Sequence, residues 1–241
     1  MYRLETRVCA SHTDVRGRLK LVSAIDMMQD CSQMWWESEP KVEQFFKERN
    51  IAQVLVFRQV GIRRVPVYGE KLCTETRVWM MKPFMGYRNT VIYDEVGELC
   101  IESWSIGAFV SLETGRPERL PPEVLASMKI DLKLEMEYLS KKITFPPGSA
   151  EKLPPIKVNR GDIDFNRHMN NARYVQTALE LLPPDFAVTR FRIEYKMPAK
   201  YGDLLYPEII SSAGNWYIVL KNGEENLKSW ALMEFCGEGK L

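Results

Sequence analysis

Apolar side chains recur at steps of three and four along residues 21–35, as on one face of an amphipathic helix: Leu21, Ile25, Met28, Cys31, Met34 and Trp35. A second helical pattern runs from Ala172 to Leu182. Pro183 and Pro184 follow it directly, and proline cannot continue a helix. The chain is therefore predicted to contain two long helices far apart in the sequence.

Each helical pattern is followed by stretches with the apolar and β-branched content of strands. They lie near 54–65, 71–81, 86–95 and 98–112 in the first half, and near 188–197, 203–212, 215–222 and 225–236 in the second. Gly97 and the pair Asn222-Gly223 are hairpin signals between such stretches. Because short turns and no helices separate these strands, we expect antiparallel sheets, each with one helix on its face.

The two halves repeat each other. Val67-Tyr68-Gly69-Glu70 in the first half corresponds to Lys200-Tyr201-Gly202-Asp203 in the second, and both halves later carry a Ser-Trp pair. Between them, residues 116–155 are rich in proline and charge and contain one short helical pattern near 121–129. The sequence thus predicts an α+β chain with repeated units at 1–115 and 156–241, joined by a linker at 116–155.

Composition narrows the class of protein. The 241 residues are 45% hydrophobic and 27% charged, and 33 basic against 32 acidic residues leave a net charge of +1. Nucleic-acid binding needs a basic surplus or stripe, which is absent here. No apolar run approaches the roughly 20 residues of a membrane span, and the first residues lack the apolar core of a signal peptide. We expect a cytoplasmic protein without nucleic-acid or membrane partners, its five scattered cysteines reduced.

The densest group of polar side chains lies directly before the second helix, in residues 162–174. It contains Asp162, Asp164, Asn166, His168, Asn170 and Asn171. His168 is one of only two histidines, and histidine titrates near neutral pH. This composition suits a site that activates water, although the acids and amides could instead cap the helix and His168 could be structural. The matching turn of the first half reads Asp14-Val15-Arg16-Gly17-Arg18, so only the second turn has catalytic character.

One helix wrapped by an antiparallel sheet, present twice in tandem, resembles the hotdog fold in its double form. The run from Asp164 to Asn171, DFNRHMNN, is similar to the signature of the acyl-ACP thioesterase family. The resemblance implies a thioester hydrolase that releases free fatty acid from long- or medium-chain acyl-ACP and so ends chain elongation. It also implies acyl carrier protein as the partner, no cofactor or metal, and a monomer or homodimer. The first half would hold the acyl chain and the second would carry the chemistry.

The chain departs from the plant members of this family at one place. They carry a Glu-Cys pair, to which catalytic roles have been assigned, where this chain has Pro198-Ala199. Catalysis is therefore expected to rest on Asp164, Asn166 and His168, with water as the attacking group. Asp164 would orient the site or act as base, His168 would share the proton transfer, and Asn166 would position the substrate.

Further residues are candidates for substrate binding. Asn170 and Asn171 stand where the free N–H groups of the second helix could bind an oxyanion. Met28, Trp35 and Met81 are candidates for the acyl-chain slot, because methionine adapts to irregular apolar space; ordinary core packing is the alternative. Arg63, Arg64, Lys82 and Arg88 could contact an acidic carrier or form a solvated sheet edge. We interpret Glu194 as a strand-face or ion-pair residue.

Three other functions compete with acyl-ACP hydrolysis. An acyl-CoA thioesterase would need a phosphate or adenine pocket, and the chain shows no glycine-rich phosphate loop. A hotdog dehydratase also uses a histidine with an acid, but the spacing of Asp164, Asn166 and His168 argues against it. A catalytically inactive module that binds acyl chains or their carrier is the alternative that the Pro198-Ala199 replacement keeps open. The preferred acyl chain length cannot be predicted from one sequence.

Overall fold

The computed structural model describes residues 1–223 and 228–238, and these form two compact units. The first unit comprises Met1–Val56 and Val60–Tyr138, and the second comprises Phe57–Gln59 and Leu139–Leu241. Residues 116–138 of the predicted linker therefore belong to the first unit, and residues 139–155 belong to the second. The assignment of an acyl-chain role to one half and a catalytic role to the other stays a prediction.

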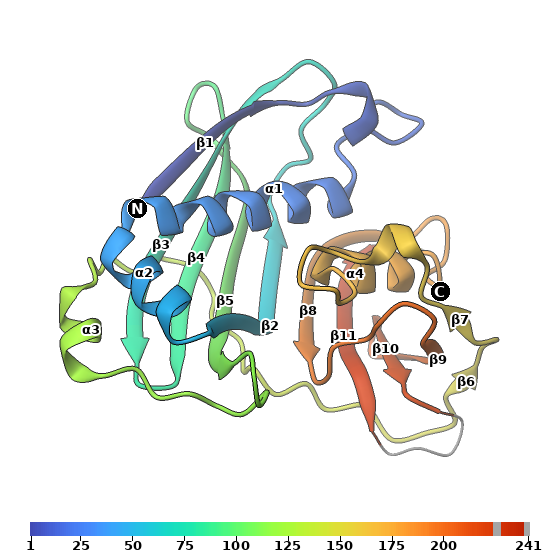
Figure 1. The fold of residues 1–241 in the computed structure, drawn as a ribbon. Helices are drawn as coiled ribbons and strands as arrows, with labels where there is room; N and C mark the ends of the chain where they lie inside the picture. The colour runs from blue at the N-terminus through green and yellow to red at the C-terminus, as the bar shows by residue number, and fades with distance from the viewer. Residues whose placement is uncertain (224–227, 239–241) are drawn as a thin grey trace. The chain divides into compact units, whose positions relative to one another are not determined.

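The first unit is an antiparallel sheet with one long helix on its face (Figure 1). Its strands lie in the order β1-β3-β4-β5-β2. The bounds are β1 (Tyr2–Arg7), η1 (Ala10–His12), α1 (Leu21–Met34), η2 (Trp35–Ser38), α2 (Pro40–Glu48), β2 (Ile51–Ile62), β3 (Lys71–Lys82), β4 (Met85–Asp94), β5 (Leu99–Ser111) and α3 (Pro122–Ser127). The predicted hairpin glycine, Gly97, lies between β4 and β5 with a φ of 87°.

Helix α1 buries the face that its periodicity predicted. Ile25, Met28 and Cys31, each three residues from the next, are completely buried, whereas Met34, which was predicted on the same face, is 39% exposed. The layer between α1 and the sheet also contains polar contacts: the hydroxyls of Ser32 and Thr90 are 3.2 Å apart. The buried Arg88 donates to the Ser32 carbonyl oxygen at 2.9 Å, so this layer is not uniformly apolar.

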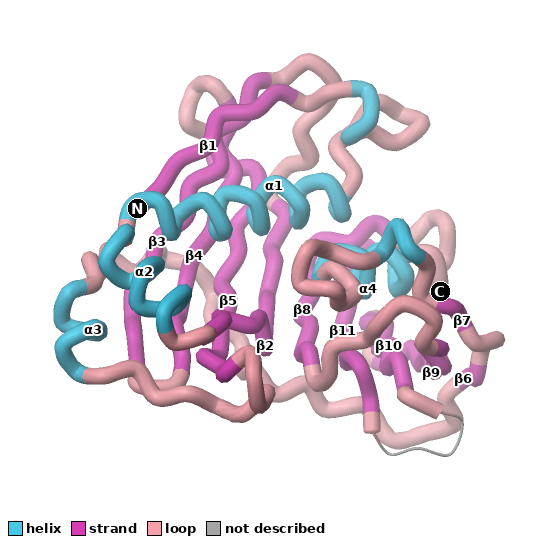
Figure 2. Tube along the Cα trace, viewed as in Figure 1, coloured by secondary structure: helices cyan, strands magenta, loops and turns pink. Residues whose placement is uncertain are grey.

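The second unit has the same plan with a shorter helix. Figure 2 shows its helix, strands and long connecting loops. Its strands follow the order β8-β11-β10-β9-β6, and β7 also pairs with β9. The bounds are β6 (Glu151–Lys152), β7 (Ile156–Lys157), η3 (Arg160–Asp162), α4 (Asn171–Leu179), β8 (Ala187–Tyr195), β9 (Leu204–Ser212), β10 (Asn215–Lys221) and β11 (Ser229–Glu238).

The predicted long helices and antiparallel strands are confirmed, within a few residues at their ends. The first residues predicted for the last strand, 225–227, lie outside the described residues. The elements that were not predicted include the short strand β6, the 3-10 helices η1, η2 and η3, and helix α2. Helix α2 starts with Pro40 and buries Val42 and Phe46, four residues apart. Among the described residues, no helix is long and apolar enough to cross a membrane.

Candidate active site

The turn before α4 has the same backbone as the turn before α1, with residue numbers offset by 150. In the second unit the N–H of Asp164 donates to the carbonyl oxygen of His168, at 2.9 Å. In the first unit the N–H of Asp14 donates to the carbonyl oxygen of Arg18, at 2.8 Å. One further residue matches as well, because Arg167 and Gly17 both have a positive φ, of 62° and 72°. The two turns therefore share these backbone features although their sequences differ.

A second segment supports each turn in the same way. The N–H of Met169 donates to the Ala199 carbonyl oxygen at 2.7 Å, as that of Leu19 does to Pro66 at 2.8 Å. Just before the turn, the N–H of Val158 donates to the carbonyl oxygen of Asp203 at 2.9 Å. The sequence repeat around the Tyr-Gly pairs thus marks the segment that holds the turn in place.

The two turns differ in what surrounds the aspartate. In the first turn, Oδ2 of Asp14 accepts from Nε and Nη2 of Arg18 at 3.1 and 3.0 Å, and Oδ1 accepts two backbone N–H groups. In the second turn, Oδ1 of Asp164 accepts the N–H of Asn166 at 2.8 Å. Among the described residues, no side chain donates to Asp164. The second turn therefore leaves a half-buried carboxylate available, where the first turn neutralises it.

Helix α4 begins directly after this turn. The side chain of Asn170 caps it by accepting the N–H of Ala172 at 2.8 Å, and the N–H of Arg173 bonds back to the Asn170 carbonyl oxygen at 2.9 Å. The N–H of Asn170 itself donates to the backbone carbonyl oxygen of Asp162 at 2.8 Å. Within the described part of the chain no acceptor is found for the N–H of Asn171, so it is a free donor at this helix end.

Two tyrosines that the sequence analysis did not single out hold this region together. Tyr174 accepts the N–H of the fully buried Ala199 at 2.8 Å, and Tyr195 donates to the Asn171 carbonyl oxygen at 3.1 Å. The two rings meet edge to face at 5.7 Å. Burial raises the pKa of Tyr174 to about 12 and also raises the pKa of Tyr195, so both hydroxyls stay protonated at neutral pH.

The predicted catalytic residues therefore share one short turn. Asp164 and His168 are half-buried and Asn166 is exposed. In the described structure, their side chains form no hydrogen bonds with one another, and His168 has no side-chain partner. Their catalytic roles stay predictions. The Pro198-Ala199 position is structural, because the backbone of Ala199 is bonded to both Met169 and Tyr174.

The residues predicted for the acyl chain lie in the first unit. Met28 and Trp35 are 0% and 1% exposed, and Met81 is half-buried. Trp35 belongs to an apolar cluster against which Met81 packs, with Val42, Phe46, Ile51, Val78, Phe109, Leu120 and Met128. The guanidinium of Arg88 lies 4.6 Å from the Trp35 ring. Binding of an acyl chain by these residues stays a prediction.

The remaining candidates have structural partners. Oε1 of Glu194 accepts the N–H of Ile143 at 2.6 Å, and its other oxygen pairs with Lys196. His12 accepts the N–H of Cys9 through Nδ1 at 3.1 Å. All five cysteines are free. Within residues 1–223 and 228–238, no three histidine, cysteine or acidic side chains converge to hold a metal ion.

Related proteins give an independent view of this architecture. The chain is 26% identical over 151 residues to a chloroplastic acyl-[acyl-carrier-protein] hydrolase of Cuphea viscosissima, covering 59% of this chain and 36% of that protein. It is 23% identical over 180 residues to a dodecanoyl-[acyl-carrier-protein] hydrolase of Cinnamomum camphora, covering 70% and 47%. The chain thus spans less than half the length of these curated relatives.

Solved structures share the fold across almost the whole chain. An acyl-ACP thioesterase from Bacteroides thetaiotaomicron superposes with a TM-score of 0.86 at 20% identity, covering 98% of this chain and 97% of the other. A 12:0-ACP thioesterase from Umbellularia californica gives 0.84 at 16%, covering 99% and 97%. These similarities confirm the predicted α+β double hotdog.

The match to two family models is stronger evidence of kinship than the identity with any single relative above. Residues 1–128 match the acyl-ACP thioesterase N-terminal domain, and residues 148–230 match the acyl-ACP thioesterase C-terminal domain. The two matches follow one another in the order of the two repeated units. The chain belongs to the acyl-ACP thioesterase family.

Proposed function

We propose that this protein hydrolyses fatty acyl thioesters carried by acyl carrier protein, releasing free fatty acid at the second turn. One observation carries the proposal. The second turn repeats the main backbone hydrogen bonds of the first, yet it replaces the ion pair of Asp14 and Arg18 with Asp164, which has no ion pair to a described residue, and His168. A family member whose duplicated turn keeps its backbone and frees its carboxylate has the parts needed to activate water.

Asp164 and His168 supply the proton transfer in this proposal. One of them takes a proton from water as the oxygen attacks the thioester carbonyl carbon, which accelerates such reactions by about 10²–10⁴-fold. The carbon–sulfur bond then breaks and the thiolate leaves, taking up a proton as the carrier's thiol. The acid product is released as a carboxylate. No covalent enzyme intermediate is required.

Two donors are available for the oxygen that becomes negative. The free N–H of Asn171 lies at the positive end of α4, where the helix dipole favours an anion. The exposed amide of Asn166 can donate a second hydrogen bond. Loss of one such donor costs about 10²–10³-fold in turnover in enzymes that use this device. Asn170 contributes indirectly, because it caps the helix that presents Asn171.

The acyl chain is assigned to the apolar residues of the first unit, with Met28, Trp35 and Met81 as contacts. Medium- and long-chain substrates both fit this assignment, since one methylene changes binding by only about 1–3 kcal/mol. The expectations of a monomer or homodimer and of a cytoplasmic location are kept as predictions.

The direct test is thiol release from medium- and long-chain acyl-ACPs and from the matching acyl-CoAs. His168→Ala tests the site, and Arg18→Ala is the matched control at the equivalent position of the first turn. We expect release from acyl-ACP that His168→Ala abolishes and Arg18→Ala preserves. Faster release from acyl-CoA would favour the acyl-CoA thioesterase. No release from either substrate would favour the inactive binding module.

A further inference from the structure

The cations suggested by the sequence for carrier binding already have partners within the first unit. Arg63 pairs with Glu102 at 2.9 Å. Arg64 pairs with both Glu70 and Asp94, each at 2.9 Å. Arg88 is buried beneath α1 and bonds to the Ser32 carbonyl oxygen. Lys82 is exposed and lies over the Tyr87 ring, 5.5 Å from its centroid. Each of the four side chains thus has a partner within the first unit, so a carrier surface is sought elsewhere.

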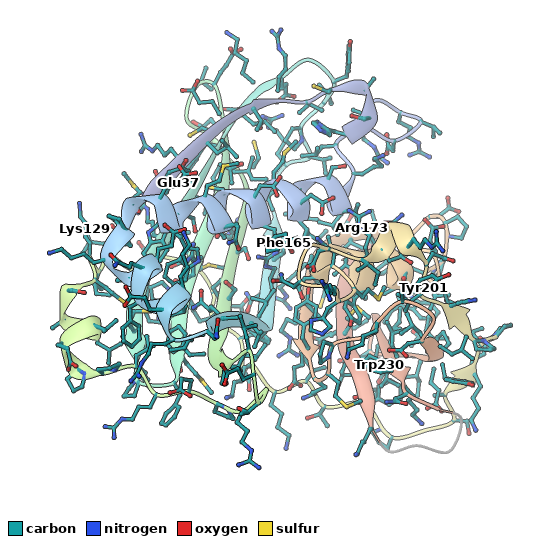
Figure 3. All side chains as sticks on the ribbon, viewed as in Figure 1. Glu37, Lys129, Phe165, Arg173, Tyr201 and Trp230 are labelled. Atoms are coloured by element: carbon teal, nitrogen blue, oxygen red, sulfur yellow. The ribbon has the colours of Figure 1, made fainter. Side chains whose placement is uncertain are left out.

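A different set of cations flanks the second turn. Arg160, Arg167 and Lys200 are all exposed, and none forms an ion pair with the residues that the structure describes. Arg160 lies over the exposed ring of Tyr201, 5.6 Å from its centroid. Lys200 directly precedes that tyrosine. Figure 3 labels Tyr201 and Phe165, exposed side chains of the two segments that form this surface.

These cations are placed differently from those of the first turn. There, Arg16, Arg18 and Lys20 occupy the positions of Asn166, His168 and Asn170, and Ala10, Gly17 and Val67 stand at the positions of Arg160, Arg167 and Lys200. The exposed apolar pairs are common to both turns: Val15 matches Phe165, and Tyr68 matches Tyr201. The second turn thus has no arginine or lysine at the positions of Asn166, His168 and Asn170, and carries its cations around them.

Two local features show that these charges are not there for internal structure. Arg167 has a φ of 62°, in the left-handed region that favours glycine, and Gly17 stands at the matching position. Its backbone gains nothing from a large side chain there. The nearby carboxylates of Asp162 and Asp203 accept backbone N–H groups, from Asn159 and Lys200, both at 2.7 Å. They bind the local backbone and form no ion pair with the three cationic side chains.

We propose that Arg160, Arg167 and Lys200 form the docking surface for an acidic face of the acyl carrier protein, which delivers its thioester to the second turn. The proposal rests on the proposed function, because it assumes that the carrier's substrate reacts beside Asp164. Exposed cations of this kind steer an acidic partner and set its orientation, and salt screens them. The surface would therefore distinguish a carrier-bound thioester from the same acyl group on a small thiol.

The test compares two thioesters of one acyl group, on the carrier protein and on pantetheine. The variant is Arg160→Ala, Arg167→Gly and Lys200→Gln in the full chain. The first two changes introduce the residues that the first turn accepts at these positions. The charge-matched control is Lys41→Gln, Arg119→Gln and Lys129→Gln, three exposed cations of the first unit without ion pairs to described residues.

The readout is the ratio of kcat/KM for the carrier-bound thioester to that for the pantetheine thioester. We expect the ratio to fall about tenfold in the docking variant, equivalent to about 1.4 kcal/mol, and to stay unchanged in the control. Raising salt from about 50 to 200 mM should lower the ratio in wild type and not in the docking variant. An unchanged ratio in the docking variant would overturn the proposal, as would an equal fall in the control.

Direct binding separates this proposal from the proposed function. Labelled carrier protein is titrated with wild type and with both variants, and fluorescence anisotropy is recorded. If wild type hydrolyses no thioester but binds the carrier, and the docking variant loses that binding, the surface is correct and the hydrolytic role is wrong. Equal carrier binding by wild type and the docking variant refutes the surface, whatever the turnover.

Discussion

Arg18 donates from Nε and Nη2 to Oδ2 of Asp14 at 3.1 and 3.0 Å, closing a turn that Asp164 and His168 leave open. Asparagine can still accept a backbone N–H, so Asp164→Asn keeps the bond to Asn166 while removing the charge and the base. We expect kcat to fall about 10²–10⁴-fold, with little change in melting temperature. Asp14→Asn is the matched control and should retain turnover within about twofold; equal losses in both variants would contradict the assignment.

Tyr174 is expected to matter for folding as well as for activity. Tyr174→Phe leaves the N–H of Ala199 buried without an acceptor, which costs about 1–3 kcal/mol. Because the carbonyl oxygen of Ala199 holds Met169, turnover should fall too. Urea unfolding provides the stability measurement, with the exposed Tyr68→Phe as control. A Tyr174→Phe protein as stable as wild type would contradict the prediction, because it would show that the fold does not depend on the hydrogen bond from Ala199 to the Tyr174 hydroxyl.

Acid sensitivity should arise in the first unit. Paired hydrogen bonds from Arg64 lower the pKa of Glu70, against the opposing effect of burial. Since the folded pKa is below the unfolded value of about 4.3, this carboxylate stabilises the fold above that pH. The stabilisation is lost as the pH falls through the folded pKa. Melting temperatures from about pH 7 to pH 3 should therefore drop less steeply in Glu70→Gln than in wild type.

The control for that measurement is Glu95→Gln. Glu95 is exposed, and its carboxylate lies 3.7 Å from the equally exposed Lys71. Its curve should follow wild type, since exposed pairs contribute little. Identical acid slopes in wild type and Glu70→Gln would remove the Arg64 pair as a source of acid sensitivity.

The two positive-φ positions should respond in opposite directions to substitution. A Cβ atom added at Gly17 would meet no atom within 4 Å, so Gly17→Ala should lower the stability only through backbone strain, by about 1–2 kcal/mol. Arg167→Gly relieves a similar strain but adds freedom to the unfolded chain, leaving a gain of about 0.5 kcal/mol. Denaturant midpoints give both values. A destabilised Arg167→Gly protein would indicate that the arginine side chain supports the turn.

The sequence predicted the repeated plan well because its signals are local. Strand alternation, Gly97 and the Tyr-Gly pairs each specify a conformation over a few residues, and the structure has strands and turns there. Helix α2 escaped prediction because it is only nine residues long and its apolar residues, Val42, Phe45 and Phe46, span little more than one turn. The spacing of Asp164, Asn166 and His168 likewise predicted a shared turn.

The partners of charged side chains could not be predicted in the same way. Arg64 donates a hydrogen bond to Asp94, thirty residues away, and Arg88 donates one to the carbonyl oxygen of Ser32, which lies in another element. Such contacts depend on strand order and on the face that each side chain takes, which a single sequence does not specify. The roles of Tyr174 and Tyr195 were missed for the same reason, because helix periodicity marks Tyr174 as core and says nothing of its hydroxyl.

Ala199 has a methyl side chain at the position where the family resemblance places the thiol of the plant members. Residues 158–203, which form the turn and its support, contain no cysteine at all. A reaction carried by Asp164, His168 and water therefore uses no thiol that peroxide could oxidise or a disulfide could trap. In the proposed mechanism, oxidation of cysteine would not remove the attacking group, as it does in an enzyme with a cysteine nucleophile.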